Sequence, residues 1–128
     1  MHLVVDAANV VGSRPDGWWR DRPGAARRLV DSVAAAVLAG RLAPPVTVVV
    51  EGAARAGVTP GPVDGPRVEV VHAERDGDTA IVTLVERLSA AAPAEPEILV
   101  VTADRALRAR VAAHGARAVA PGWLRERL

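Results

Sequence analysis

Acidic side chains follow several short apolar runs in this sequence of 128 residues. The runs cover residues 3–5, 46–50, 68–72 and 98–102, and their lengths and bounding turn residues predict buried strands. In open α/β sheets, ligands bind at the carboxyl ends of the strands, so we expect the side chains that follow these runs to share one sheet edge. These side chains are Asp6, Asn9, Glu51, Asp76, Asp78 and Asp104.

A cluster of carboxylates at one edge indicates a metal site. If the strands before Asp6 and Asp104 are neighbours, these two acids face each other, with Asp78 close by. Carboxylates a few ångströms apart repel by roughly 1 to 4 kcal/mol per pair in wet surroundings, so such a cluster implies a divalent cation. Oxygen ligands without any Cys favour Mg²⁺ or Mn²⁺ over Zn²⁺, and either ion can activate water for attack on a phosphodiester.

Each acid also has a purely structural interpretation. Asp78 and Asp104 lie where a helix N-cap is needed, so capping and metal binding both stay open for them. Asp6 precedes a stretch that we predict to be non-helical, which favours a functional role. Glu51 is either a solvated strand end or a metal ligand. Asp76 is interpreted as a turn residue before Asp78, although either of the two could be the ligand.

Polar residues beside these acids are candidates for positioning or substrate binding. Asn9 either satisfies backbone groups in its turn or holds Asp6 or a substrate phosphate. Thr102 either orients Asp104 or a phosphate, or is an ordinary strand-end hydroxyl. Arg105 begins a basic region, since residues 105–128 contain six Arg and one acid, Glu126. This region could form a phosphate-binding face or a solvated helix surface.

A turn-rich loop at residues 13–20 carries two tryptophans. Trp18 and Trp19 lie between Arg14 and Arg20, a combination that could stack on single-stranded bases and contact their phosphates. The alternative is that at least one of the two indoles packs beneath the loop. If the loop is functional, it should lie beside the acidic edge, because it follows the strand that ends at Asp6.

Strands and helices alternate along most of the chain. We predict helices from Asp21 to Gly40, from residues 76–80 to a point before Pro93, from Asp104 to Gly115, and at 123–128, with a last strand at 117–120. Residues 52–66 contain many Gly and Pro and are expected to form a long exposed loop. This pattern predicts one α/β domain over residues 1–128, with a mostly parallel sheet of about five strands.

Composition excludes several classes of function. The net charge is +1, the sequence has no Cys, and all 16 basic residues are Arg. The absence of Lys excludes Schiff-base chemistry, a P-loop, a receiver domain and a haloacid-dehalogenase-type site. A haloacid-dehalogenase-type site also needs a second Asp two residues after Asp6, where this sequence has Ala8. No G-x-G-x-x-G motif follows the first strand. We expect no signal peptide and no membrane segment, and a reducing cytoplasm fits the absence of Cys.

Four motifs together resemble the NYN branch of the PIN-like nuclease superfamily, especially the small bacterial YacP-like ribonuclease domains. They are residues 5–12, 50–52, 77–81 and 101–104, in the family's order. The resemblance implies a PIN-like three-layer fold with the first strand central, and metal-dependent endoribonuclease activity. It also implies a divalent ion held by Asp6, Asp78 and Asp104, with Asn9 assisting. Two departures are Ala8, where the family usually has an aromatic residue, and Glu51, where Asp is common.

Two functions follow from these observations. The first is a Mg²⁺- or Mn²⁺-dependent endoribonuclease whose partner is RNA. The second is an RNA- or ribosome-binding module of the same fold with weak or no catalysis, against which the repulsive carboxylates argue. Both a monomer and a homodimer are compatible with the sequence.

Overall fold

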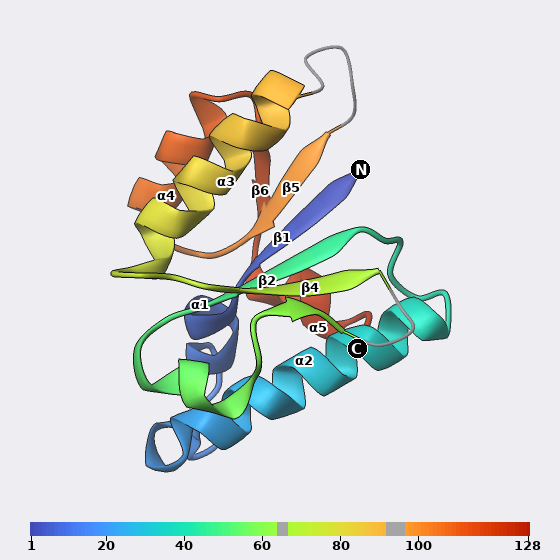
Figure 1. Cartoon of the computed structure of the whole chain (residues 1–128), viewed down its shortest axis with the longest axis vertical. Coiled ribbons are helices and arrows are strands. Elements are labelled where there is room, and N and C mark those ends of the chain that lie inside the picture. Colours follow the sequence, from blue (N-terminus) through green and yellow to red (C-terminus); the bar gives the residue numbers. More distant parts are fainter. Residues whose placement is uncertain (64–66, 92–96) are drawn as a thin grey trace.

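A six-stranded sheet in the order β3-β4-β2-β1-β5-β6 forms the centre of the computed structural model, which describes residues 1–63, 67–91 and 97–128 (Figure 1). The strands are β1 (His2–Asp6), β2 (Val46–Val50), β3 (Gly61–Pro62), β4 (Val68–His72), β5 (Ile98–Val101) and β6 (Arg117–Val119). Neighbouring strands are parallel except β3, which is antiparallel to β4. The five predicted strands are confirmed. The two-residue β3 was missed because it is short and contains Pro, which is tolerated at a sheet edge.

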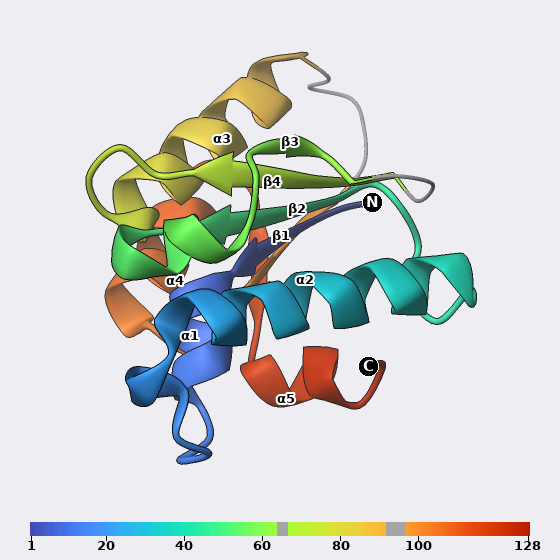
Figure 2. The same ribbon diagram turned by 60° about the horizontal axis from the view of Figure 1, so that its bottom comes forward.

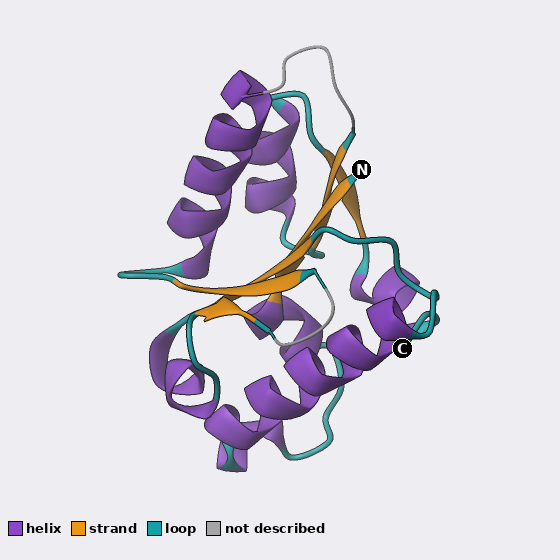
Figure 3. Cartoon of the chain, turned by 45° about the vertical axis from the view of Figure 1, so that its right-hand side comes forward, coloured by secondary structure: helices purple, strands orange, loops and turns teal. Residues whose placement is uncertain are grey.

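Helices cover both faces of the sheet, giving three layers (Figure 3). They are α1 (Ala7–Gly12), α2 (Arg22–Leu38), α3 (Gly77–Ala91), α4 (Arg105–Ala112) and α5 (Pro121–Arg125), with 3₁₀ turns η1 (Trp18–Arg20) and η2 (Gly52–Gly57). Successive side chains of a strand point to opposite faces, so Val5 packs in the core under α1 and α2 while Val4 packs under α3 and α4. The predicted α/β class with a mostly parallel sheet is confirmed.

The prediction that the segment after Asp6 is non-helical is wrong. It forms α1, and Asp6 is its N-cap, with the Asn9 backbone N–H donating to Asp6 Oδ1 at 3.3 Å. A helix of six residues is too short to show a helical repeat in the sequence. Its stability comes from this cap and from the buried side chains of Ala7 and Val10.

The expected loop after β2 is also more ordered than predicted. Within residues 52–63 the chain forms η2 and β3, while residues 64–66 lie outside the described residues. Figure 2 shows η2 beside the N-terminal part of α2. Gly57 makes this approach possible, because a Cβ there would collide with the Pro23 carbonyl oxygen. This contact fixes the separation between η2 and α2.

The last helix begins earlier than expected. We predicted helical structure over 123–128, whereas α5 starts at Pro121, a favourable first helical residue. No helix in the described ranges is long and apolar enough to cross a membrane.

Candidate functional site

The central strand β1 ends where the chain reverses its direction of travel across the sheet. From β1 the chain adds β2 and β4 on one side, and then returns to add β5 and β6 on the other. β1 and β5 are parallel neighbours, with Val5 opposite Val101. Their carboxyl ends are therefore the switch point at which α/β sheets bind ligands, and Asp6 and Thr102 meet there.

A hydrogen-bonded chain joins the two central acids through Thr102. The Thr102 hydroxyl donates to Asp6 Oδ2 at 3.0 Å and accepts from the Asp104 backbone N–H at 3.1 Å. Thr102 is fully buried, so its hydroxyl is held by these two partners. The prediction that Thr102 orients Asp104 therefore has a structural basis in the backbone of Asp104, and Thr102 also orients Asp6.

Asp6 is a buried carboxyl group, only 5% exposed. Its pKa is raised to about 6, chiefly by burial; the hydrogen bonds from Thr102 and from the Asn9 backbone oppose this shift, and the negative charges of Asp78 and Glu51 add to it. The group therefore gains or loses its charge in a pH range where ordinary Asp side chains remain ionised.

The structure distinguishes Asp76 from Asp78. Asp76 is the capping residue of α3, since its Oδ1 accepts from the Thr79 backbone N–H at 2.7 Å, and this bond lowers its pKa. Asp78, in the first turn of α3, is half-buried. Burial raises the pKa of Asp78, and the nearby charges of Asp104, Asp76 and Glu51 add to the shift. Asp78 is thus the acid that faces the cluster.

Asp104 combines both roles that the sequence left open. Its Oδ1 accepts from the Leu107 backbone N–H at 3.1 Å and so caps α4. Its charge also acts on Asp78. Asn9, in α1, reaches the segment that follows β5, where its Oδ1 accepts from the Ala103 backbone N–H at 2.8 Å. The amide therefore ties α1 to the segment that leads to Asp104.

Glu51 follows β2 and lies at the margin of this edge. Its Oε2 accepts from the Gly77 backbone N–H at 3.1 Å, which connects β2 to the start of α3. A Cβ on residue 77 would lie 3.1 Å from Glu51 Oε1, so the absence of a side chain there allows this contact. Glu51 is therefore held by a backbone group and is not a freely solvated strand end.

The carboxylates share an edge but do not form a ready-made metal cage. Within residues 1–63, 67–91 and 97–128, no three acidic or His side chains are close enough together to bind one ion. Their chemistry nevertheless fits a hard divalent cation. Asp6, Asp78, Glu51 and Asp104 offer only oxygen ligands and repel one another, and Mg²⁺ commonly uses one or two carboxylates together with water and substrate phosphates.

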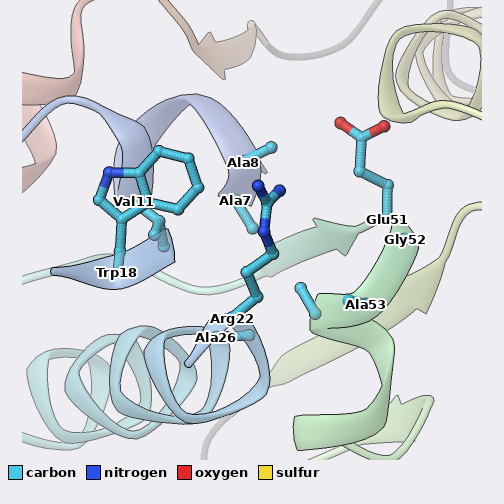
Figure 4. Close-up of a pocket in the computed structure, with 10 residues that line it drawn as sticks. Ala7, Ala8, Val11, Trp18, Arg22, Ala26, Glu51, Gly52 and Ala53 are labelled. Atoms are coloured by element: carbon cyan, nitrogen blue, oxygen red, sulfur yellow. The ribbon is translucent and has the colours of Figure 1, made fainter. Parts of the chain in front are cut away.

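A pocket of about 340 Å³ adjoins the acidic edge (Figure 4). Its walls come from α1, η1, the first turns of α2 and η2. The lining residues are Ala7, Ala8, Val11, Trp18, Arg22, Ala26, Glu51, Gly52, Ala53 and Ala54. Glu51 belongs to both the pocket and the acidic edge, so the two form one continuous site.

The other predicted substrate-binding residues are dispersed. Trp18 is half-buried and lines the pocket, whereas Trp19 lies outside its lining and is 48% exposed. Arg14 is exposed and lies near Arg125. The pKa of the Arg125 guanidinium is lowered chiefly by burial and also by the positive charge of Arg14. Arg105 is exposed in the first turn of α4. Only Trp18 of this group is brought to the pocket.

Sequence reasoning missed Arg22. It lies next to Pro23 at the start of α2, and its guanidinium carbon is 5.0 Å from the centre of the Trp18 ring. One signal in the sequence could have indicated Arg22. The predicted N-cap Asp21 directly follows the loop at 13–20, so the first turn of the helix, which contains Arg22, lies beside the Trp loop.

Comparison with known proteins bears on the fold. No family model and no curated protein matches the sequence. Two crystal structures of Rae1 (YacP) from Bacillus subtilis, one of them a point mutant, match the structure. The mutant has a TM-score of 0.73 and 23% identity, with 99% of this chain and 74% of that chain covered. The other has a TM-score of 0.70 and 22% identity, with 99% and 73% covered.

This chain has the fold of Rae1 (YacP). The likeness extends over nearly the whole chain and confirms, at the level of the fold, the YacP-like and PIN-like architecture predicted from the sequence motifs. In the YacP-like fold seen here, the central strand ends at Asp6 and carries the candidate site.

Proposed function

We propose that this protein is a divalent-metal-dependent endoribonuclease. The observation that carries the proposal is the convergence of carboxylates from separate strands at the switch point, where they raise the pKa of Asp6 and Asp78. A cluster of mutually repelling acids is costly to keep in a protein that does not use it. The resemblance to YacP-like ribonuclease domains and the fold shared with Rae1 (YacP) support RNA as the substrate.

Asp6, Asp78 and Asp104 would hold the ion, partly through water molecules, with Glu51 at the margin. When bound, a Mg²⁺ or Mn²⁺ ion polarises a phosphodiester and lowers the pKa of a water molecule. The protein's own contribution is positioning. The Thr102 hydroxyl donates to the Asp6 carboxylate and holds it in place. Asn9 Oδ1 accepts from the Ala103 backbone N–H, which leaves the Asn9 NH₂ group to donate to a phosphate oxygen.

A comparison of two N-cap variants tests this proposal. Asn caps a helix about as well as Asp, so Asp104→Asn keeps the cap of α4 while removing a charge from the acidic edge. Asp21→Asn is the matched control, because Asp21 caps α2 by the same kind of bond, to the Gly24 backbone N–H at 3.0 Å. Cleavage of a mixed RNA is measured with Mn²⁺ and with EDTA. We expect Asp104→Asn to lose at least about tenfold in rate, the equivalent of one transition-state interaction of 1.4 kcal/mol, and Asp21→Asn to cleave like the parent.

The second candidate function is RNA binding, on a ribosome or elsewhere, without catalysis. It is favoured by the lack, in the described part of the chain, of three acids spaced to bind one ion. Cleavage by the parent that persists in EDTA contradicts the metal-dependent mechanism. RNA binding without any cleavage in Mn²⁺ supports the second candidate instead.

A further inference from the structure

The pocket beside the acidic edge has the size and lining of a ligand site. Its volume of about 340 Å³ lies in the range of small-molecule pockets, roughly 300 to 1,000 Å³. Small side chains from α1 and η2 leave the space open, and one aromatic and two charged side chains face it, namely Trp18, Arg22 and Glu51 (Figure 4). This is the usual composition of such sites, a mainly apolar wall with a few polar groups.

Trp18 is held in a defined orientation. Its backbone N–H donates to Asp16 Oδ1 at 3.3 Å, and its ring meets the Trp19 ring edge to face, with centroids 5.9 Å apart and planes at 88°. On another side the indole lies over Gly12, 3.8 Å from the position of a Cβ there. The indole is therefore packed against Trp19 and the end of α1, and it also lines the pocket.

Arg22 supplies a positive charge to the same surface. Its guanidinium lies over the Trp18 ring, and it forms no salt bridge within the described residues. A guanidinium can stack on an aromatic plane while its N–H edge donates to a phosphate. Glu51, on the opposite wall, would repel a phosphate, so an anionic group entering the pocket is directed toward Arg22.

We propose that this pocket binds one unpaired nucleotide of an RNA strand, with its base against Trp18 and Arg22 and a phosphate on Arg22. The proposal deepens, and rests on, the proposed RNA-cleaving function. It makes Trp18 and Arg22 the substrate-positioning pair and leaves Trp19 and Arg14 outside this role. A bound nucleotide at this place would continue its strand toward Glu51 and the acidic edge.

The chain offers a matched control, because Trp19 and Arg20 form a second Trp–Arg pair, 5.9 Å apart, outside the pocket lining. Binding of a labelled single-stranded RNA of mixed sequence is measured by fluorescence anisotropy in EDTA. Trp18→Ala should weaken binding roughly 5- to 150-fold, the range for loss of one base stack. Arg22→Ala should also reduce the salt dependence, log K against log salt, by about 0.7 for one lost phosphate contact. Arg20→Ala should bind like the parent, and Trp19→Ala, which removes one contact of the Trp18 ring but no wall of the pocket, should lose much less affinity than Trp18→Ala.

A third variant covers the case in which Trp18→Ala does not fold. Ala8 is exposed and lines the pocket, so Ala8→Leu fills the space without disturbing the core, and it should weaken RNA binding while the melting temperature stays unchanged. Equal loss in the Trp19 and Trp18 variants, or unchanged affinity in Trp18→Ala and Ala8→Leu, overturns the pocket. The pocket is also overturned if duplex RNA binds the parent as tightly as single-stranded RNA does.

These readouts separate the pocket from the catalytic proposal. The difference in EDTA between the pocket variants and their controls reports on the pocket, and Mn²⁺-dependent cleavage by the parent reports on the acids. Loss of binding in the pocket variants, with a parent that does not cleave, supports the nucleotide pocket and contradicts the nuclease. If the parent cleaves RNA in Mn²⁺ but the Trp18 and Arg22 variants bind RNA as tightly as the parent, the nuclease is supported and the pocket is contradicted.

Discussion

Asp6 makes the stability of the folded protein depend on pH in an unusual direction for an acid. Because burial raises its pKa from 3.8 to about 6, folding favours the neutral form of the carboxyl group. Its contribution to stability is fully present below its unfolded pKa and is lost as the pH rises through about 6. The shift corresponds to about 3 kcal/mol at 1.36 kcal/mol per pKa unit.

We therefore predict that Asp6→Asn flattens part of the pH dependence of unfolding. In metal-free buffer, the free energy of unfolding of the parent should fall relative to that of Asp6→Asn by about 2 to 3 kcal/mol between pH 4 and pH 7. Denaturant titrations of both proteins across this range measure the difference. Parallel curves would show that the Asp6 carboxyl group is not buried as described.

Thr102 provides a second prediction at the scale of a single residue. Thr102→Val keeps the shape but removes the hydroxyl that donates to Asp6 and accepts from the Asp104 backbone, so it should cost about 1 to 3 kcal/mol of stability. Losing this donor also raises the pKa of Asp6, since the Thr102 hydrogen bond lowers it. Protons then compete more strongly with metal for the carboxylate. At subsaturating Mn²⁺, the pH profile of cleavage should move to higher pH.

Thr102→Ser is the control for this experiment, since it retains the hydroxyl. It should keep the pH profile of the parent even if the lost methyl group lowers stability. A profile that moves equally in the Ser and Val variants would assign the effect to packing and not to the hydrogen bond.

At the scale of elements, α5 supports the site from a distance. Arg125 of α5 donates to the Val10 carbonyl oxygen and to Ser13 Oγ, the latter at 3.0 Å from Nε. These groups lie at the end of α1 opposite Asp6, where the chain leaves toward Trp18. The C-terminal helix therefore holds the end of α1 and the start of the loop that carries the pocket residue.

We predict that Arg125→Ala destabilises the protein by about 1.5 to 3 kcal/mol, the usual value for hydrogen bonds to a charged group. RNA affinity should fall as well, because the Trp18 loop loses its anchor. Arg127 is the control: its guanidinium lies 4.0 Å from the Trp123 ring and donates to the Trp123 carbonyl, so its side chain contacts its own end of the chain. Arg127→Ala should leave RNA affinity unchanged in the anisotropy assay, and equal effects of both variants would contradict the anchoring role.

The same elements show what could be predicted from the sequence. Apolar runs were sufficient for the parallel strands, and the central place of β1 agrees with the resemblance and the topology. Asp6 as a helix cap, and Asp76 in place of Asp78 as the cap of α3, were not predictable. Both depend on which backbone N–H each carboxylate meets, namely those of Asn9 and Thr79. Arg22 was missed because its partner Trp18 belongs to another element.

At the scale of the whole molecule, the acidic edge is assembled from parts far apart in the chain. Asp6, Glu51, Asp78 and Asp104 follow different strands, and each except Asp78 also accepts a backbone hydrogen bond that ties elements together or caps a helix. A site built in this way exists only in the folded chain. A cation that neutralises the edge must therefore bind the folded state more tightly than the unfolded state.

This linkage predicts that Mn²⁺ stabilises the protein as a whole. At a Mn²⁺ concentration of about 100 times Kd, the free energy of unfolding should rise by about 2.7 kcal/mol. For a chain of this size that corresponds to a Tm increase of roughly 10 °C.

Asp104→Asn should be as stable as the parent or more stable in EDTA, because part of the repulsion is gone, and it should gain much less from Mn²⁺. Asp21→Asn should gain as much as the parent. Melting curves with Mn²⁺, with EDTA and with NaCl at matched ionic strength measure these gains, and an equal gain in NaCl or in Asp104→Asn would contradict metal binding at this edge.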